Sequence, residues 1–475
     1  MKVCLLNDSF PPVIDGVANV VKAYADVLHA AKDSSVMVAT PVYPDAGYEQ
    51  YPYPIVAYPS LDVASITAGY RAGYPFPIKE IAAMTQFAPD VIHTHCPIVS
   101  CFIARSLRET TDAPVIFTYH TKYDIDIRRT IPLPHLQDES IRALVNNVSA
   151  CDDVWAVSEG AADNLRSLGY EGNCIVMPNG VDFAKGRQSE ELTSALSEEF
   201  RLKNDRVTFL FVGRMMNYKG LPLILDALEI LKGKGCRFQM VFVGSGADRA
   251  GLIRKAKDMG FAVDVREEDG TITFAEESDA RIIFAGAERQ RERLRAWNTR
   301  ADLFVFPSTF DTNGLVVREA AACGLASVLV RGSCAAEGVT DGRNGYLIEE
   351  TAQDLARMLL WACEQRDALK QTGEHAMQEI YLSWPDAVHL AQKRYQEVLE
   401  LKKAGRLKQH RPLADDPLFS MTADAVKRYI DTHTYEMPRY EGMLDNFEET
   451  LRSNRRRIEG LVSDLKDEFL NRNNG

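Results

Sequence analysis

The stretch LFVFPSTFDTNGLVVREAAACG, from Leu303 to Gly324, decides the fold class of this chain. It begins with an apolar run, residues 303–306, that Pro307 closes, which is typical of a buried parallel strand. A polar loop with turn residues follows, and then a helical segment, 315–322, that the glycine ends. The order strand, loop, helix places the loop at the carboxyl end of a strand, where open α/β sheets bind ligands.

Two carboxylates flank the start of this helix. Asp311 precedes it and Glu319 lies one to two turns inside it, so both could hydrogen-bond hydroxyl groups of one ligand. The free N–H groups at the helix start would suit an anion. Taken alone, the stretch is more simply a surface loop with two solvated acids, and the rest of the chain decides between these interpretations.

The remaining sequence alternates strand-like and helix-like segments. Strands are expected at 1–6, 35–39, 91–93, 115–119, 153–157 and 174–177, and again at 207–212, 238–243, 282–284, 303–306 and 327–330. Such alternation predicts mostly parallel, doubly wound sheets. We therefore predict an α/β protein with two Rossmann-like domains facing a cleft, residues 1–183 and 184–382. A helix at 383–404 is expected to cross back to the first domain, and 405–475 to form a linker and a helical tail.

Four segments depart from this alternation. Residues 43–77, rich in Tyr and Pro, are interpreted as an irregular excursion, and the polar stretch 179–204 as an interdomain linker. The acidic segment 263–279 predicts a surface hairpin to which we assign no chemistry. Between 440 and 465, apolar residues at 3-4-7 spacing predict an amphipathic tail helix. That helix could pack on the chain's own body, or form a homo-oligomer seam or a partner surface.

Composition narrows the class of protein. A chain of 475 residues exceeds what one core supports. The net charge of −12 argues against a general nucleic-acid binder. Nine cysteines are scattered without a CxxC pair, which fits thiols in a reducing cytoplasm. No apolar run approaches ~20 residues, and the start is too quickly polar for a signal peptide. A cytoplasmic protein is expected.

Three more loops are expected at strand ends. Residues 213–220, GRMMNYKG, carry Arg214 and Lys219, and two cations at a strand end suit a diphosphate. The Gly-Ser-Gly at 244–246 follows the next strand, although such glycine pairs are often only turns. In the first half, the loop SFPPVIDG brings Gly16 to the start of a helix, where backbone amides can meet a phosphate. All of these loops could converge across a cleft.

This ordered series of motifs resembles the family 4 glycosyltransferases, retaining enzymes with two Rossmann-like domains, the GT-B fold. The matching segments lie within residues 1–400 and are SFPPVIDGV, HTH, FTYHTKY, VSEG, PNGVD, VGRMMNYKG, VGSG, ADLFVFPS and the opening stretch. The resemblance implies an acceptor-side first domain and a second domain that binds a nucleotide sugar, expected to be UDP-glucose or UDP-galactose, without a cofactor or metal. Asp124-Ile125-Asp126 matches the DxD pattern of metal-dependent enzymes of another fold, but so short a match arises by chance.

The resemblance also implies roles for individual residues. Arg214 and Lys219 would bind the donor diphosphate and stabilise the charge that grows on the leaving group. The backbone at Gly16 would approach the same diphosphate, and Glu319 would hold the ribose. Further donor contacts are implied at Asn313, Gly314 and Leu315, and catalytic positions at His120, facing the transferred sugar, and Asp311, near the donor sugar. The alternative for the histidine is a core side chain at a strand end.

One position departs from the family pattern. The family usually has Glu at the position of Asp311, with seven residues between it and Glu319. Aspartate keeps the charge but shortens the reach by ~1.5 Å. The donor sugar and the role of this residue are therefore left open. A non-catalytic protein that binds a nucleotide sugar, or helps a partner assemble, is the alternative that this departure and the tail raise.

A basic and apolar run lies on the expected acceptor side. Lys122, Arg128 and Arg129 alternate with apolar residues up to Leu133, which in most proteins is a solvated loop. However, the FPPVIDGV and TYHTKY segments most resemble family members that glycosylate diacylglycerol at the membrane surface, and cation-plus-apolar segments suit that interface. We therefore expect a membrane glycerolipid acceptor at the inner face of the cell membrane. A soluble sugar, polyol or polysaccharide is the alternative acceptor.

Overall fold

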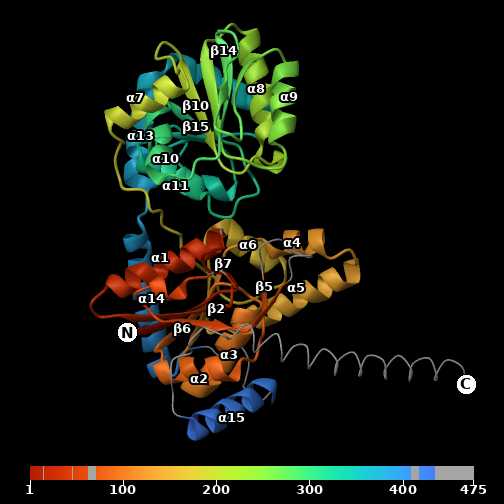
Figure 1. Cartoon of the computed structure of the whole chain (residues 1–475), viewed down its shortest axis with the longest axis vertical. Helices are drawn as coiled ribbons and strands as arrows, with labels where there is room; N and C mark the ends of the chain where they lie inside the picture. The colour runs from red at the N-terminus through yellow and green to blue at the C-terminus, as the bar shows by residue number, and fades with distance from the viewer. Residues whose placement is uncertain (14, 45, 63–70, 408–416, 434–475) are drawn as a thin grey trace, which may run out of the picture. The chain divides into compact units, whose positions relative to one another are not determined.

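The computed structural model describes residues 1–13, 15–44, 46–62, 71–407 and 417–433, and two parallel sheets carry its fold (Figure 1). Packing divides the chain into two compact units. Of the described residues, the first holds those within Met1–Phe117, Ala150–Asp152 and the segment from Gly405 onward, and the second holds those within Thr118–Ser149 and Asp153–Ala404. None of the helices within these described ranges is long and apolar enough to cross a membrane.

The first sheet has seven strands in the order β3-β2-β1-β6-β7-β8-β9. Their bounds are β1 (Lys2–Leu6), β2 (Ser35–Pro41), β3 (Ile55–Tyr58), β6 (Val91–Thr94), β7 (Val115–Tyr119), β8 (Asp153–Ala156) and β9 (Ile175–Val176). A separate hairpin joins β4 (Ser60–Asp62) to β5 (Arg71–Gly73). The inner strand β1 runs parallel to both of its neighbours and is almost wholly buried, as an apolar run between two helical layers must be.

Helices accompany this sheet in the order that alternation predicts. They are α1 (Gly16–Ala30), η1 (Tyr48–Gln50), α2 (Ile78–Phe87), α3 (Val99–Thr111), α4 (Tyr123–Thr130), α5 (Pro134–Ser149) and α6 (Glu159–Ser167). Asp15 caps α1 by accepting a hydrogen bond from the Ala18 amide, and Ser158 caps α6 in the same way.

The second sheet has eight strands in the order β13-β12-β14-β11-β10-β15-β16-β17. Their bounds are β10 (Val207–Val212), β11 (Phe238–Val243), β12 (Ala262–Arg266), β13 (Ile272–Thr273), β14 (Ala280–Gly286), β15 (Leu303–Phe306), β16 (Ser327–Val330) and β17 (Tyr346–Ile348). Every pair is parallel except β12 with β13. The chain leaves β10 toward β11 and later returns to β15 on its other side, so the strand order reverses there, and such switch points form ligand sites.

Helices of the second sheet lie on both of its faces. They are α7 (Glu190–Glu199), η2 (Asn217–Lys219), α8 (Leu221–Gly233), α9 (Arg249–Asp258), α10 (Arg291–Arg300), α11 (Leu315–Ala322), η3 (Cys334–Ala336), α12 (Ala352–Glu364), α13 (Arg366–Glu379) and α14 (Trp384–Lys403). Figure 1 shows α8 and α9 on one side of β10 and β14, and α7 and α10 on the other.

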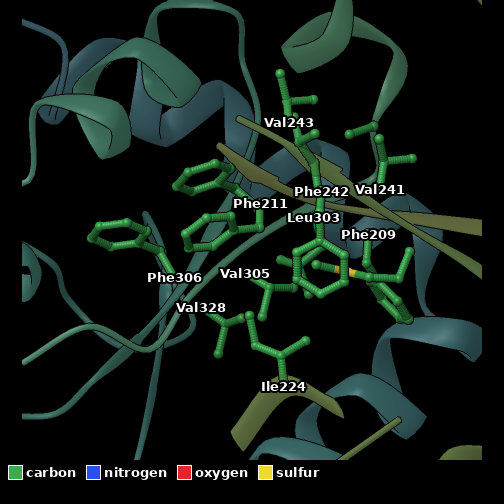
Figure 2. Packing of buried hydrophobic residues seen from close by; sticks show 14 of the residues in the cluster. Phe209, Phe211, Ile224, Val241, Phe242, Val243, Leu303, Val305, Phe306 and Val328 are labelled. Atoms are coloured by element: carbon green, nitrogen blue, oxygen red, sulfur yellow. The ribbon is translucent and has the colours of Figure 1, made fainter. Parts of the chain in front are cut away.

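Aromatic side chains fill the core between these layers (Figure 2). Phe211 of β10 stacks on Phe306 of β15 with ring centroids 5.8 Å apart, and Phe242 of β11 stacks on Phe284 of β14 at 5.1 Å. The four residues of β15 are at most 1% exposed. A strand so tightly packed gives the loop that follows it a rigid base.

The α/β class and the two doubly wound sheets are confirmed, and the opening stretch folds as predicted. Its strand spans Leu303–Phe306, its helix spans Leu315–Ala322, and Gly324 takes a left-handed φ of 70° just beyond the helix. A single αL residue there lets the chain leave the helix without strain.

Three of the irregular segments are more regular than the sequence indicated. Within 43–77, Ile55–Tyr58 forms the buried edge strand β3, because a short apolar run pairs with β2 despite its Tyr- and Pro-rich flanks. The stretch 179–204 contains α7, which Ser189 caps and which packs on α10. The hairpin at 263–279 is confirmed, but its first strand is an inner strand of the sheet. Its charged position Asp264 is buried because Arg281 pairs with it.

The part of the tail that the structure describes is α15 (Pro417–Thr432), which packs against α2 and α3. The Phe419 ring stacks on Phe102 with centroids 6.0 Å apart, and the Arg105 guanidinium lies 4.1 Å from the Phe419 ring centroid. This helix therefore packs on the chain's own body. The apolar residues between 440 and 465 lie outside the described residues.

Candidate active site

The candidate site lies where β10 and β15 end side by side. Phe209 pairs with Leu303 and Leu210 with Phe304, so the loops that follow the two strands leave the same edge of the sheet. The first loop, 213–220, carries the two predicted cations, and the second, 307–314, carries the first predicted acid. The sequence alone does not reveal that the two loops are neighbours, because they are about 90 residues apart in the chain.

The loop after β10 is held by the glycines of the Gly-Ser-Gly turn. A Cβ added to Gly244 would lie 1.9 Å from the carbonyl oxygen of Gly213, and one added to Gly246 would lie 2.4 Å from that of Met215. The Met215 amide also donates to the carbonyl of Ser245 at 2.8 Å. These two glycines therefore allow backbone to pack on backbone, and this packing positions the cation-bearing loop.

The two cations of this loop differ in their surroundings. Arg214 is exposed, and its guanidinium makes no hydrogen bond or ion pair with another residue in the described ranges. Lys219 is 8% exposed, and its Nζ lies 2.5 Å from Asp311 Oδ1 and 5.6 Å from the ring centroid of Phe306. One cation is thus open to a ligand and the other is held in place by an acid.

Asp311 is bound to the protein at both carboxylate oxygens. Oδ1 faces Lys219, and Oδ2 accepts a hydrogen bond of 2.5 Å from the hydroxyl of buried Ser308. The aspartate is short enough to be held within its own loop by these contacts. Its role toward a donor sugar stays a prediction, and Ser308 is a partner that the sequence gave no reason to single out.

The start of α11 presents backbone groups beside this pair. Gly314 precedes the helix with φ 60° and ψ 45°, and a Cβ on it would lie 3.0 Å from Ala335. No side chain caps this helix, which begins at partly buried Leu315. Asn313 Nδ2 donates to the carbonyl of Val157 at 2.5 Å. The uncapped amides leave a positive end at the predicted donor position.

His120 follows strand β7 and is 6% exposed. Burial lowers the pKa of its imidazole to about 3, so the ring is neutral near pH 7. Its carbonyl oxygen accepts a hydrogen bond of 2.7 Å from Thr312 Oγ1, one residue after the short acid. The structure therefore places the predicted histidine next to the predicted acid loop, as a neutral donor or acceptor.

Glu319 lies one turn inside α11 with its side chain 13% exposed. Burial raises the pKa of its carboxyl, and the guanidinium of Arg291, with Nη2 2.7 Å from Oε1, opposes that rise. The same guanidinium pairs with Asp182. Sequence reasoning missed Arg291, because it sits in the run RQRER and nothing local distinguishes it from its neighbours.

Gly16 belongs to the first of the two compact units, whereas the site residues described above belong to the second. It is the first residue of α1, it is exposed, and no atom lies within 4 Å of where its Cβ would be. Asp15, the residue before it, caps the first turn of the helix and itself accepts a hydrogen bond of 2.7 Å from Ser9 Oγ. The helix start is therefore ordered and open.

Asp124 and Asp126, the DxD-like pair, both lie in α4. In the described part of the chain no group of three or more His, Cys, Asp or Glu side chains could hold a metal ion. Asp124 Oδ1 accepts a hydrogen bond of 3.3 Å from Asn164. Desolvation raises the pKa of Asp126, while Arg129 and Arg214 oppose the rise.

Solved structures share this architecture. The chain is similar to Anabaena Alr3699/HepE in complex with UDP, with a TM-score of 0.63 and 17% identity over 84% of this chain and 100% of that one. It is also similar to sucrose-phosphate synthase from Thermosynechococcus elongatus, with a TM-score of 0.62 and 17% identity over 84% and 99% of the two chains. The fold is that of the GT-B glycosyltransferases.

Family models identify the particular family. Residues 14–185 match the model described as Glycosyltransferase Family 4, and residues 193–379 match Glycosyl transferases group 1. The chain belongs to glycosyltransferase family 4, as its motifs indicated, and it is a glycosyltransferase that uses a nucleotide sugar.

Relatives of stated activity cover most of the chain. A GDP-mannose-dependent alpha-mannosyltransferase of Corynebacterium glutamicum is 27% identical over 369 residues, 74% of this chain and 77% of the relative. An alpha-monoglucosyldiacylglycerol synthase of Streptococcus pneumoniae is 24% identical over 336 residues, 68% of this chain and 70% of the relative. The first relative is named for a mannosyl transfer from GDP-mannose and the second for a glucosylated diacylglycerol.

Proposed function

We propose that the protein is a retaining, metal-independent hexosyltransferase that moves glucose or galactose from a UDP-sugar to an acceptor hydroxyl. One observation carries this proposal. An open arginine and a buried lysine lie at the end of β10, beside the uncapped start of α11. Three positive groups at one strand edge match the charge of a diphosphate, which becomes the leaving group.

The chemistry follows from which bond breaks. The bond between the sugar's anomeric carbon and the diphosphate oxygen breaks, and Arg214 and Lys219 stabilise the charge left on the phosphate. The acceptor oxygen attacks the same face, and its proton passes to the departing phosphate oxygen, so the anomeric configuration is retained. His120 stays neutral at working pH and accepts or donates a hydrogen bond at a sugar hydroxyl. Glu319 holds the ribose, and Asp311 keeps Lys219 aimed at the phosphate.

We further propose a membrane glycerolipid of the diacylglycerol type as acceptor. Leu133 and Leu136 are 58% and 47% exposed at the junction of α4 and α5, and Arg128 and Arg129 are exposed just before them. Large apolar side chains next to cations suit the surface of an anionic bilayer. The Streptococcus pneumoniae relative named above is described as a synthase of a glucosylated lipid of this class. Such a protein would work at the inner face of the cell membrane.

A radiolabelled donor assay tests the reaction. Purified protein is incubated with UDP-glucose, UDP-galactose or GDP-mannose, with diacylglycerol in mixed micelles or with a panel of soluble sugars and polyols. Label that passes from a UDP-sugar into the lipid fraction supports the full proposal. Transfer only to a soluble acceptor would contradict the proposed glycerolipid acceptor. Transfer from GDP-mannose alone would show that the nucleotide is assigned wrongly. Absence of both transfer and slow donor hydrolysis would leave only a binding or assembly role.

Sedimentation with vesicles tests the membrane contact separately. Binding to phosphatidylglycerol vesicles should fall as salt rises, because exposed charges are screened beyond about 8 Å at physiological ionic strength. Changing Leu133 and Leu136 together to Ser should reduce binding at both salt concentrations. Equal binding by the variant and the unaltered protein would exclude this surface.

A further inference from the structure

Arg291 lies against the acid assigned to the ribose. We propose that Arg291 is a positioning residue for nucleotide binding: its guanidinium fixes the Glu319 carboxylate so that the remaining lone pairs face the ribose diol. This inference rests on the proposed function, because it takes that acid as the ribose ligand. It adds a residue from α10, which lies outside every motif that carried the family resemblance.

Contacts from two separate segments hold the guanidinium in place. Nη2 donates to Glu319 Oε1 of α11 at 2.7 Å and also pairs with Asp182, in the segment after β9. The guanidinium carbon lies 4.4 Å from the ring centroid of Phe183, which is 2% exposed. The planar group is thus stacked on one face and bridged by two acids, an arrangement that arginine permits and lysine reproduces only in part.

The charges around Glu319 make its contact with Arg291 important for keeping the carboxylate ionised. Burial is the largest influence on Glu319 and raises its pKa, Asp182 raises it further, and Arg291 is the cation that opposes both. The other titratable group facing this acid is Cys323 at the end of α11, whose pKa burial raises to about 11, so it is uncharged near pH 7. Arg295 of α10 faces that thiol. Without the Arg291 guanidinium, the carboxyl would be protonated over a wider range of pH.

A protonated Glu319 binds a diol less well, because one of its oxygens becomes a donor. The affinity of the unaltered protein for UDP between pH 6.5 and 8.5 is the reference, because it includes the ionisation of the diphosphate itself. In Arg291→Gln the folded pKa of Glu319 rises, so affinity should fall as the pH drops through that new value, by up to about tenfold per pH unit. Raising the pH should restore it.

Calorimetric titration with UDP at pH 6.5, 7.5 and 8.5 measures this effect. Arg291→Gln should bind UDP about tenfold more weakly at pH 6.5 and approach the unaltered protein at pH 8.5. Its binding at low pH should release a proton, visible as a heat that changes with the buffer's ionisation enthalpy. Arg293→Gln is the matched control: it lies on the same helix, pairs with Glu199 and Glu288, and should leave the profile like that of the unaltered protein.

Two further variants keep the inference testable if Arg291→Gln does not fold. Arg291→Lys keeps the charge and should show a profile between those of the Gln variant and the unaltered protein. Glu319→Gln cannot ionise and should bind weakly at every pH. A uniform loss at all pH values in the Arg291 variants, or no loss, would overturn the inference. If the unaltered protein binds neither UDP nor GDP, the proposed function itself fails.

Discussion

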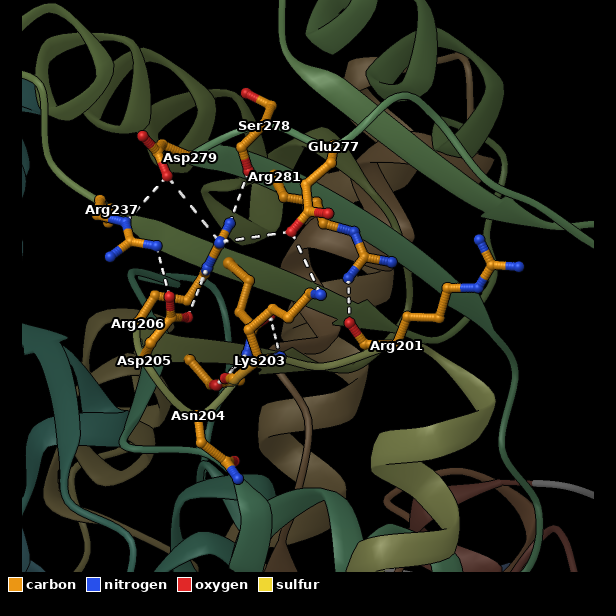
Figure 3. A network of polar contacts seen from close by, with 12 residues as sticks. Arg201, Lys203, Asn204, Asp205, Arg206, Arg237, Glu277, Ser278, Asp279 and Arg281 are labelled. Atoms are coloured by element: carbon orange, nitrogen blue, oxygen red, sulfur yellow. Dashed lines mark hydrogen bonds and ion pairs between the residues drawn. The ribbon is translucent and has the colours of Figure 1, made fainter.

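The two ends of the second sheet use the same residue types in opposite ways. At the amino ends of β10, β11 and β14, Arg206, Arg237 and Arg281 are each bonded to protein groups (Figure 3). At the carboxyl end of β10, Arg214 has no such bond to another described residue, and the start of α11 has no side-chain cap. Charges satisfied by the chain itself add stability, whereas charges left open are available to a ligand.

We call the amino ends of β10, β11 and β14 the closed end of the sheet, and the carboxyl end of β10 with the start of α11 the open end. Each arginine of the closed end is bonded to more than one protein group. The Arg206 side chain is 3% exposed, donates to the carbonyl of Ser278 at 2.6 Å and lies 3.3 Å from Asp205. Arg237 shares the same aspartate and also bonds Asp279 at 2.9 Å. These arginines tie the turns before three strands together, so removing one should loosen the sheet without touching the open end.

Arg214→Ala should have the largest effect on activity. Its guanidinium makes no hydrogen bond or ion pair with another described residue, so removing it should cost little stability, but the leaving group would lose one of its cations. Loss of a single charge-stabilising donor typically lowers turnover by about 10²–10³-fold. Measuring kcat with the best donor checks the loss of activity, and measuring the melting temperature checks that stability is kept. A melting point lowered in step with activity would break the contrast between the two ends.

Arg206→Ala should show the reverse behaviour. Its buried guanidinium makes charge-assisted hydrogen bonds, and their loss should lower the free energy of unfolding by about 2 kcal/mol. The kcat and KM for the donor should stay within twofold of the unaltered protein at 20 °C. Urea denaturation and initial rates supply the two measurements. A selective loss of kcat with unchanged stability would show that the closed end contributes to catalysis.

The strand, loop and helix of the open end could be predicted almost to the residue, because local patterns define them. Leu303–Phe306 is an unbroken apolar run and Gly324 a plain stop, so no distant information was needed. The edge strand Ile55–Tyr58 and helix Glu190–Glu199 were missed because their surroundings are polar or rich in Tyr and Pro, and only pairing with β2 or packing on α10 stabilises them.

The candidate site likewise contains residues that local motifs predict and contacts that they do not. Arg214 and Lys219 could be selected because they follow a strand within one short motif. The pairing of Lys219 with Asp311 spans 92 positions and that of Arg291 with Glu319 spans 28, and neither spacing has a local signature. Sequence patterns thus indicate which residues reach the open edge, while tertiary contacts decide which of them are held by another residue.

Asp311→Asn tests whether the open end depends on one internal pair. In the unaltered protein Lys219 Nζ lies 2.5 Å from Asp311 Oδ1. The amide of the variant keeps the shape of the side chain and can still accept a hydrogen bond from Ser308, but it no longer neutralises the lysine. We expect kcat to fall about tenfold as the lysine loses its fixed position, with a smaller change in donor KM. Steady-state kinetics at saturating donor measure this, and Asp311→Ala should fall further. Full activity in the Asn variant would show that the pair is not needed.

The last prediction concerns the buried histidine. The pKa of His120 falls from its ordinary value to about 3 on folding because burial disfavours the charged ring. Between those two values the unfolded chain binds more protons than the folded one, so the contribution of His120 to stability is present above pH 6.5 and is lost as the pH falls. The slope approaches about 1 kcal/mol per pH unit below pH 6. Urea denaturation between pH 4.5 and 7.5 measures it.

His120→Gln should flatten this slope, because glutamine does not ionise, while the slope in Arg206→Ala should match that of the unaltered protein. The activity of the unaltered protein should likewise show no ionisation from this residue between pH 5 and 9. If stability has the same pH dependence with and without the histidine, the ring is charged or solvated in the folded state. In that case the ring would take up its proton near its ordinary pKa of about 6.5, and the rate of transfer should change with pH around that value.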